Sequence, residues 1–445
     1  MIFQRLQQTC RYRPQLRTIL SGILFSACLV GSAAAQQSLQ NNPKFRPEKP
    51  APEAIGLYKP IDLSRREELP NDLADQLRGK TPVEQVDQMY KWLRRKGYSL
   101  KINNTNLNNA ADREILKLWA IWRAASLTAQ KEPEEIRDQA DDLRNELKRA
   151  GSTLPAGPGQ QKFRQGLFDL LIPELAAVMD NSMAVRLQAA LTLGQMDLKR
   201  PGTGLPVTPP ITYSKAALPL IDVIEDPKQL EPVKVVATRM IDRLFTHAAT
   251  LPAAEKLAAA DALTAELAKP NTYFWYQMVL ADALASLDLK YNRDRKPVVH
   301  DALVKVVGDN KRYFAVRTEA AKALTRIPLP AEADPQAIAR LIHDLMKELV
   351  NAYQANPNNP LWKPLIVKMD QVFHAVDEIE SDDLPVDSLL ASRDAAIATL
   401  GKVFEPVFVF VLTDGNNGQR LPQNLVDAVN EDVLGGSGNP VTSQP

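Results

Sequence analysis

Residues 313–327 read YFAVRTEAAKALTRI, and residues 183–196 carry the same pattern as MAVRLQAALTLGQM. Both stretches contain Ala-Val-Arg, then Ala-Ala, then Leu at identical offsets. The apolar positions of the later copy recur at the spacing of one helical face, at Val316, Ala320, Leu324 and Ile327. A helix this short is not stable alone in water, so it needs similar helices to pack against. The pattern therefore predicts an all-α fold built from stacked helices.

Further copies of the pattern lie between and after these two stretches. Val185 and Val316 are 131 residues apart, which accommodates three units of about 44 residues each. Intermediate copies at Val233 and Tyr276 give spacings of 48, 43 and 40 residues, and a fainter fifth copy follows at Arg393. Two more helices are expected before that fifth copy, over 336–355 and 360–379. A row of helix pairs is therefore expected, with a compact multi-helix bundle as the alternative.

These residues resemble HEAT repeats of the armadillo-like α-solenoid class. In that class the second helix of each pair carries Val-Arg-x-x-Ala-Ala-x-x-Leu after an aspartate. The resemblance implies a right-handed α-solenoid of HEAT-like helix pairs over residues 162–405. It also implies a ladder along one edge in which aspartates pair with cations: Asp180, Arg186, Asp226, Lys234, Asp309 and Arg317. The third unit departs from this pattern, because Gln277 stands at the cation position.

A small helical region is expected before the repeats, over residues 61–150. Thr81 and Glu84 have the spacing of a capping box, Gly97 suits the end of that helix, and Asn108 or Asn109 can cap a later one. The segment 151–161, GSTLPAGPGQQ, is rich in Gly and Pro and is predicted to be the main internal boundary.

The segment 406–414, PVFVFVLTD, alternates β-branched and aromatic residues, which is typical of extended structure rather than of a helix. We therefore expect residues 406–445 to form a cap on the last repeat followed by a disordered tail.

The first 60 residues have a different composition from the rest. Residues 1–35 combine four arginines, an apolar run and Ala-Ala-Ala, which indicates a secretory signal peptide and an exported, periplasmic or secreted protein. An uncleaved anchor and a lipoprotein attached at Cys28 are the alternatives. Residues 36–60 contain many prolines and little to bury, so we expect a disordered linker. No transmembrane segment is predicted beyond the signal peptide.

Without residues 1–35 the chain holds 50 basic and 53 acidic residues, a net charge of −3. Because basic and acidic residues are nearly equal in number, the chain has no overall positive potential that would attract nucleic acid, and no nucleic-acid partner is predicted. Cys10 and Cys28, the two cysteines, both lie in the predicted signal. Disulfides, cysteine zinc sites and thiol nucleophiles are therefore not expected in the exported chain.

The sequence offers no assembled catalytic set. The histidines stand singly, at His247, His300, His343 and His374. Asp414 and Asn416 begin a calcium-like loop, but Leu425 occupies the place of the bidentate glutamate. Phosphate-binding glycine loops and Gly-x-Ser-x-Gly are missing. No catalytic, cofactor-binding or metal-binding residue is predicted, and no cofactor.

Four aromatic residues stand together at the start of a predicted helix: Tyr273, Phe274, Trp275 and Tyr276. Four successive residues span all faces of a helix, so at least two of them should point outward. They are interpreted either as packing between repeats or as contacts for a partner.

An exported helical repeat without a catalytic set favours a non-enzymatic scaffold that binds a protein partner on its second helices. One alternative is a HEAT-like solenoid enzyme, or a small-molecule-binding, lyase-type protein of the periplasm. A deep pocket joining carboxylates to two or more of four residues would favour that alternative: Trp92, Trp119, His247 and His300. A self-associating envelope component is the third possibility.

Overall fold

The computed structural model describes residues 58–103, 107, 109–202, 208–248, 252–269, 272–375, 384–413 and 418–434. These residues are mostly α-helical with one two-stranded ribbon, which confirms the all-α class. They divide into two compact units, an N-terminal unit ending at Thr272 and a C-terminal unit beginning at Tyr273. The predicted signal peptide, most of the predicted linker, the calcium-like turn at Asp414 and the tail from residue 435 lie outside the described residues.

The N-terminal unit contains ten α-helices, two 3-10 helices and the ribbon among its described residues. In chain order they are η4 Leu63–Arg65, α4 Asn71–Leu77, α5 Pro82–Arg95, α6 Tyr98–Asn103, α7 Ala110–Ala129, α8 Pro133–Arg149, α9 Pro158–Ala176, α10 Met183–Gly194, β1 Asp197–Lys199, β2 Ile211–Thr212, η5 Ser214–Ala217, α11 Leu218–Glu225, α12 Glu231–Thr246 and α13 Ala253–Leu267.

The described part of the C-terminal unit contains only helices and loops. They are α14 Phe274–Ala285, α15 Val298–Gly308, α16 Phe314–Leu324, α17 Pro335–Ala355, α18 Trp362–Phe373, α20 Ala395–Thr413 and α21 Gln423–Asn430. The two helices predicted between the fourth and fifth copies are present as α17 and α18.

Local signals in the sequence fix several helix ends. The Thr81 side chain accepts from the Glu84 amide, and the Glu84 carboxylate accepts from the Thr81 amide at 2.8 Å, so the predicted capping box is confirmed. Gly97 follows α5 with φ of 71°, a conformation that suits glycine. The Asn109 side chain accepts from the Ala111 amide at 3.0 Å, so Asn109 is the one of the two predicted candidates that caps α7.

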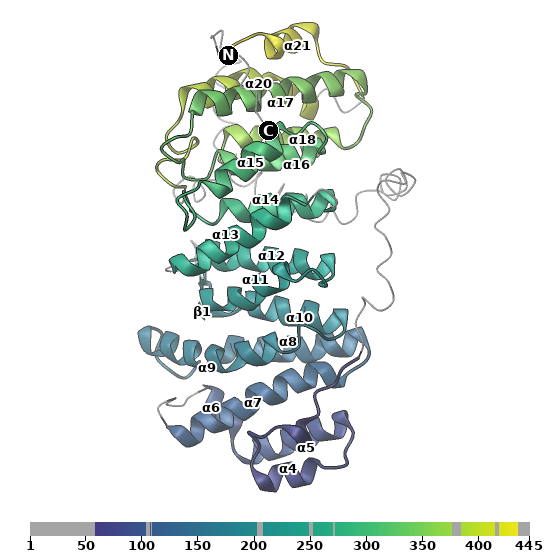
Figure 1. Cartoon of the computed structure of the whole chain (residues 1–445), viewed down its shortest axis with the longest axis vertical. Coiled ribbons are helices and arrows are strands. Elements are labelled where there is room, and N and C mark those ends of the chain that lie inside the picture. Colours follow the sequence, from purple (N-terminus) through teal and green to yellow (C-terminus); the bar gives the residue numbers. More distant parts are fainter. Residues whose placement is uncertain are drawn as a thin grey trace, which may run out of the picture. The chain divides into compact units, whose positions relative to one another are not determined.

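In the N-terminal unit the helices pack in two layers. α8, α10 and α12 contact one another in succession in one layer (Figure 1). In the other layer α7 packs against α9, and α11 packs against α13. Contacts of α7 with α8, α9 with α10 and α11 with α12 join the layers. Val185 and Val233 therefore lie on neighbouring helices of one layer, as the repeat predicts.

The C-terminal unit repeats this arrangement. α14, α16, α18 and α20 contact one another in succession, and α15, α17 and α21 form a second succession. α16 lies at the centre of the unit, because it touches α14, α15, α17 and α18. Tyr276 and Val316 lie on the adjacent helices α14 and α16, again as the repeat predicts.

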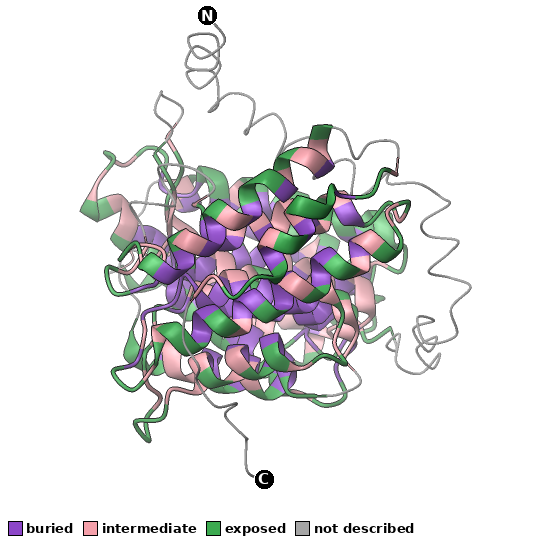
Figure 2. Cartoon of the chain, turned by 90° about the horizontal axis from the view of Figure 1, so that it is seen from above, coloured by how far each residue is buried: buried purple, intermediate pink, exposed green. Residues whose placement is uncertain are grey.

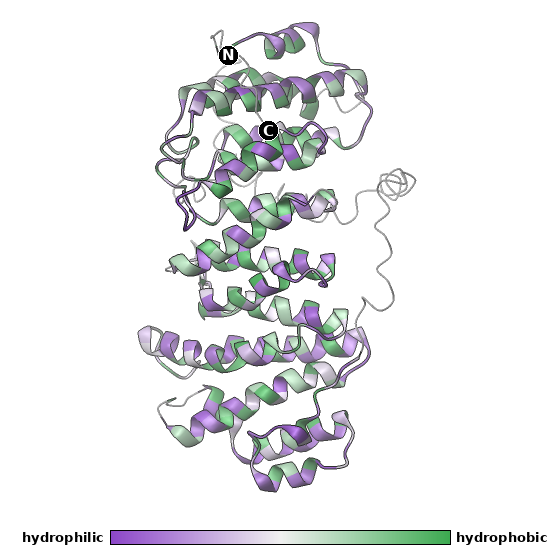
Figure 3. Cartoon of the chain, viewed as in Figure 1, coloured by the Kyte–Doolittle hydropathy of each residue, from purple (hydrophilic) through white to green (hydrophobic). Residues whose placement is uncertain are grey.

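Burial follows the predicted helical faces. Val316, Ala320 and Leu324 are fully buried, and Ile327 is 1 % exposed. Buried residues lie on the sides of the helices that face other helices, and exposed residues lie on the outward sides (Figure 2). Most helices accordingly carry both hydrophobic and hydrophilic residues (Figure 3). The stack is held by apolar area removed from water between the layers.

α10 and α12 approach one another closely because α10 ends in a glycine. A Cβ atom added at Gly194 would overlap the side chain of Met240 on α12. Glycine in a helix lowers stability relative to alanine when nothing else is affected. At Gly194 the missing Cβ leaves the space that the Met240 side chain occupies.

The predicted boundary at 151–161 does not divide the structure, which separates into units at Thr272 and Tyr273 instead. The Gly151 amide donates to the Ile102 carbonyl at 2.9 Å, and Arg164 donates to the Ala150 carbonyl at 3.1 Å. α7 also packs on α9, and α8 packs on α10, across this segment. Its Gly and Pro residues therefore form a turn inside one unit, since chain-breaking residues mark a turn but not its tertiary surroundings.

The loop between the first two repeats begins and ends in the ribbon. β1 and β2 pair antiparallel, and Asp197 on β1 accepts from Arg243 on α12 at 2.8 Å. Burial raises the pKa of Asp197, while the Arg243 guanidinium opposes that rise. The ribbon therefore attaches the base of the loop to the helices.

The predicted extended segment at 406–413 is wrong, because α20 continues through it. The buried side chains recur three or four residues apart, at Leu400, Phe404, Val407 and Val411. Packing against α17, α18 and α21 selects this helical face, overriding the strand preference of the alternating residues. The predicted end of the repeats at Glu405 therefore falls inside a helix.

α20 is also the one described helix that is long and apolar enough to cross a membrane by length and composition. It packs in succession after α18, as an inner helix of a helical array does. A membrane-spanning helix and a buried helix of a helical array both satisfy this criterion of length and composition.

Candidate functional site

The predicted ladder cations lie near the starts of α10, α12 and α16 and are all buried. Arg186 donates through Nε to the Asn181 carbonyl and through Nη1 to Gln229 Oε1 at 2.8 Å. Gln229 stands before α12, in the next helix pair. Burial lowers the pKa of Arg186. Arg186 therefore connects its own loop with the following pair.

Lys234 makes the same kind of connection one pair later. Its Nζ atom donates to the Ile224 carbonyl at 2.6 Å and to Glu266 Oε2, on α13, at 3.2 Å. The Lys234 and Glu266 side chains are 5 % and 9 % exposed. Burial lowers the pKa of Lys234, and the Glu266 carboxylate opposes that effect. The ammonium is therefore held by a carbonyl of its own pair and a carboxylate of the next.

Arg317 repeats the arrangement in the C-terminal unit. Its Nε atom donates to the Val307 carbonyl at 2.8 Å. Its two terminal nitrogens donate to Glu348 on α17 at 2.5 and 3.0 Å, which is a bidentate pair. The hydrogen bond from Arg317 holds the pKa of Glu348 below its ordinary value. Each of these three cations thus bridges successive helix pairs.

The three predicted ladder aspartates have other partners. Asp180 accepts from Lys59 at 3.0 Å, and Asp226 accepts from the Lys228 amide at 2.8 Å. Asp309 accepts from the Lys311 amide at 3.1 Å and from Arg312 at 3.3 Å. A short carboxylate in a loop bonds nearby amides most easily, whereas a long cationic side chain reaches the next pair.

The two atypical copies also differ in structure. In the third copy Gln277 accepts from Arg312 at 2.7 Å, so a cation of the next pair supplies the bridge. In the fifth copy Arg393 precedes α20, has φ of 52° and is exposed. Arg393 therefore has no place on the helix that corresponds to Arg317.

The four aromatic residues at the start of α14 point in different directions. Tyr276 is fully buried, whereas Trp275 is 40 % exposed. Tyr273 and Phe274 are half-buried, and the Phe274 ring lies 5.2 Å from that of Tyr313. Tyr276 thus belongs to the packing between helices, and Trp275 presents an indole ring at the surface. Contact with a partner at these residues stays a prediction.

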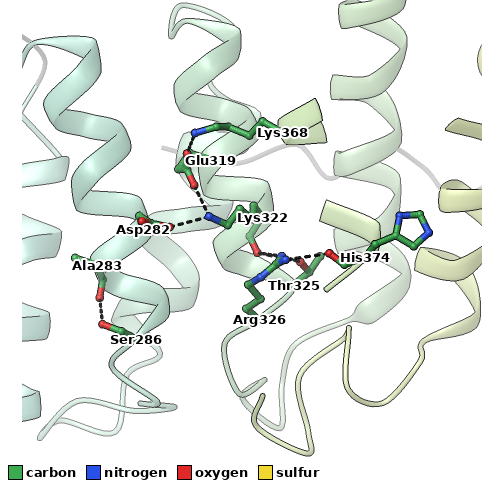
Figure 4. A network of polar contacts seen from close by, with 9 residues as sticks. All are labelled: Asp282, Ala283, Ser286, Glu319, Lys322, Thr325, Arg326, Lys368 and His374. Atoms are coloured by element: carbon green, nitrogen blue, oxygen red, sulfur yellow. Dashed lines mark hydrogen bonds and ion pairs between the residues drawn. The ribbon is translucent and has the colours of Figure 1, made fainter. Parts of the chain in front are cut away.

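A row of four charged side chains that sequence reasoning missed crosses α14, α16 and α18 (Figure 4). Lys322 donates to Asp282 at 2.8 Å and to Glu319 at 2.9 Å, and Lys368 pairs with the same Glu319. Glu319, in the middle of the row, is 4 % exposed on its side chain, whereas Asp282 at one end is 51 % exposed, so the row runs from the surface into the layer. Two acids alternate with two lysines, which leaves the row without net charge.

Mutual charge stabilises the ionised forms in this row. Burial by itself would lower the pKa of Lys322, but Glu319 and Asp282 raise it on balance. Burial would likewise raise the pKa of Asp282, but Lys322 and Lys368 bring it below its ordinary value. Lys322 and Asp282 are therefore held in their charged forms, and the row connects three neighbouring helices. The sequence signal for it is a Glu-x-x-Lys pair, Glu319 and Lys322, at one helical turn.

The described histidines do not come together. His343 is buried and its Nε2 lies 2.8 Å from the Val429 carbonyl, while His300 lies 3.0 Å from its neighbour Asp301. Among the residues that the structure describes, no group of three or more His, Cys, Asp or Glu is placed to hold a metal ion.

Two cavities of the described part of the chain lie in the N-terminal unit. The larger, about 720 Å³, opens beside the Gly/Pro segment and is lined by residues that include Arg113, Lys162 and Asp169. The smaller, about 370 Å³, lies beside α5 and α8. Neither is lined by Trp92, Trp119, His247 or His300.

Comparison of the chain with family models, with curated proteins and with solved structures finds no match.

Proposed function

We propose that this chain is an exported, right-handed α-solenoid of HEAT-like helix pairs that acts as a scaffold for a protein partner. Support for the repeat comes from the successive contacts of α8, α10 and α12 in one unit and of α14, α16, α18 and α20 in the other. Support for export is the composition of residues 1–35. Each helix pair then contributes a strip of surface to an extended binding face.

The observation that carries the proposal is the recurring bridge from one helix pair to the next. Arg186, Lys234 and Arg317 occupy corresponding positions, and each bonds an acceptor of the following pair. Such bridges fix neighbouring pairs in register within each unit. A surface that is already ordered loses little conformational entropy on binding, which favours association.

The proposed contact surface is centred on the exposed indole of Trp275. Trp and Tyr side chains at the centre of interfaces contribute a large share of binding energy. Trp275 is 40 % exposed at the first turn of α14, on the helix that also supplies Asp282 to the charged row. A partner that contacts Trp275 would therefore meet a rigid helix.

Site-directed photo-crosslinking tests this proposal. A photoreactive phenylalanine analogue replaces Trp275 in the exported chain, and a matched variant carries it at Leu100, which is 74 % exposed in the other unit. We expect a single adduct with another protein at position 275 and none at position 100. Absence of any adduct at 275, or the same adducts at both positions, would contradict the proposal. An adduct with a second copy of this chain would instead support the structural envelope role.

A further inference from the structure

The smaller cavity of the N-terminal unit is built from four helices. Its lining residues come from α5, α6, α7 and α8, and the nearly buried ones among them, Trp122 and Arg123 of α7 and Tyr98 of α6, form its floor. α6 has only six residues, so it covers little of the surface of α5 and α7. The volume of about 370 Å³ is at the lower end of the range for ligand sites and suits a ligand of one or two rings.

One wall of the cavity is aromatic. The Tyr90 and Trp122 rings stack with centroids 5.4 Å apart, and Tyr98 meets Trp122 edge-on at 5.8 Å. Tyr90 is 37 % exposed, whereas Trp122 and Tyr98 are nearly buried. The three rings are therefore a fixed apolar wall, and Tyr90 offers its exposed part to a ligand.

A buried ion pair forms the polar floor. Arg123, only 5 % exposed, donates from Nε to Glu146 at 2.8 Å and pairs through Nη2 with the same carboxylate at 2.5 Å. Trp119 donates to Glu146 at 2.9 Å, and the Arg123 guanidinium lies 4.2 Å over the Trp122 ring. These contacts hold Arg123 in one orientation. Its third nitrogen, Nη1, has no acceptor in the described part of the chain, so two N–H groups remain for a ligand.

Tyr98 adds a second fixed group to this floor. Its hydroxyl donates to Glu146 at 3.5 Å, and burial, followed by the charge of Glu146, raises the pKa of Tyr98 to about 12. The phenol therefore remains neutral over the physiological range. Together with Arg123 it occupies the acceptor atoms of Glu146, so the buried carboxylate is already satisfied.

The remaining lining combines acceptors and donors with little net charge. Asp87 and Asp142 supply carboxylates, Gln139 supplies an amide, and Arg149 supplies a guanidinium. With the Arg123–Glu146 pair neutralised, two acids face one free cation around the opening. A strongly anionic ligand would be repelled by Asp87 and Asp142, whereas for a cationic ligand Arg149 offsets only one of these two negative charges.

From this geometry we propose that the cavity binds a neutral sugar unit of an oligosaccharide. Each sugar hydroxyl both donates and accepts hydrogen bonds, which matches the mixed groups of the lining. The C–H face of a pyranose ring is apolar and packs against an exposed aromatic ring such as Tyr90. Arg123 donates to ring or hydroxyl oxygens from the floor, and Gln139 and Asp142 bond hydroxyl groups at the side.

Titration calorimetry of the exported chain with chitotriose, maltotriose and cellotriose tests the site. At least one trisaccharide should bind, and Tyr90→Ala and Gln139→Ala should each weaken binding by about tenfold. Tyr90 is exposed and Gln139 is half-buried, so the variants should fold, and their helical circular dichroism checks this. Leu100→Ala, at an exposed position of α6 outside the lining, is the matched control and should bind as the parent does.

Three results would overturn the proposal. One is the absence of binding by all three trisaccharides in a folded parent chain. Another is unchanged affinity in both Tyr90→Ala and Gln139→Ala, which would place the sugar elsewhere. The third is binding of trilysine that Asp142→Asn abolishes while the sugars fail to compete, since this would define the cavity as a cation site.

Discussion

Replacing Glu319 by Gln tests whether the charged row stabilises the C-terminal unit. Glu319 accepts from Lys322 at 2.9 Å and pairs with Lys368, and its side chain is 4 % exposed. A hydrogen bond to a charged group contributes about 1.5–3 kcal/mol. The glutamine oxygen still accepts one neutral hydrogen bond, and Lys322 keeps Asp282 at 2.8 Å. We therefore expect the free energy of unfolding to fall by roughly 2–3 kcal/mol, below the full sum of two bonds.

Urea unfolding followed by circular dichroism measures this loss. The midpoint should move to lower urea with an unchanged slope, and Tm should fall by about 5–10 °C in a cooperative unit of this size. Glu431→Gln, at an exposed position of the same unit, is the control and should change stability by less than about 0.5 kcal/mol. A double-mutant cycle with Lys368→Met should give a coupling of about 1 kcal/mol or more.

The reasoning would be refuted by a Glu319→Gln variant as stable as the Glu431→Gln control. That result would mean that the desolvation of the four charges cancels their attraction. A stability loss without coupling to Lys368 would instead assign the effect to the bond between Glu319 and Lys322 or to packing.

Two further predictions concern close packing and the bridges. Gly194→Ala should destabilise the N-terminal unit by about 1–3 kcal/mol in urea unfolding, because the new methyl group overlaps Met240. Gly159→Ala is the matched helical control, has open space around the new Cβ, and should be neutral or stabilising by up to about 1 kcal/mol. The hydrogen bond from Arg317 lowers the pKa of Glu348 in the folded protein. The contribution of Glu348 to the free energy of unfolding is therefore fully present above pH 4.5, the ordinary pKa of this group, and is lost as pH falls through its pKa in the folded state. The Tm difference between the parent and Glu348→Gln should therefore shrink as pH falls below about 4.5, and a constant difference down to pH 3 would contradict this assignment.

Much of the fold could be predicted because its determinants are local. The capping box at Thr81, the cap at Asn109 and the apolar face through Val316 each depend on residues within one or two helical turns. The segment 406–413 was predicted incorrectly because that prediction also rested on the local sequence pattern alone. Its alternation favours a strand locally, but its neighbours bury Phe404, Val407 and Val411 on one helical side.

The candidate sites could be predicted much less well, because their members come from different helices. The sequence identified Arg186 and Arg317 as ladder positions, but their acceptors Gln229 and Glu348 lie 43 and 31 residues further on. No motif fixes such separations, since loop lengths between helix pairs vary. The cavity beside Trp122 likewise depends on four helices and has no signature in any one of them.

The sequence by itself determined the helical class, the positions of the repeated helices and which side of each helix is apolar. These features follow from helical periodicity and from capping, and both depend on interactions between residues a few positions apart. Only the tertiary structure decided which charged side chains meet, where the units divide and where a cavity remains. Those features depend on the distance between helices far apart in the chain, which is set by side-chain packing across many residues.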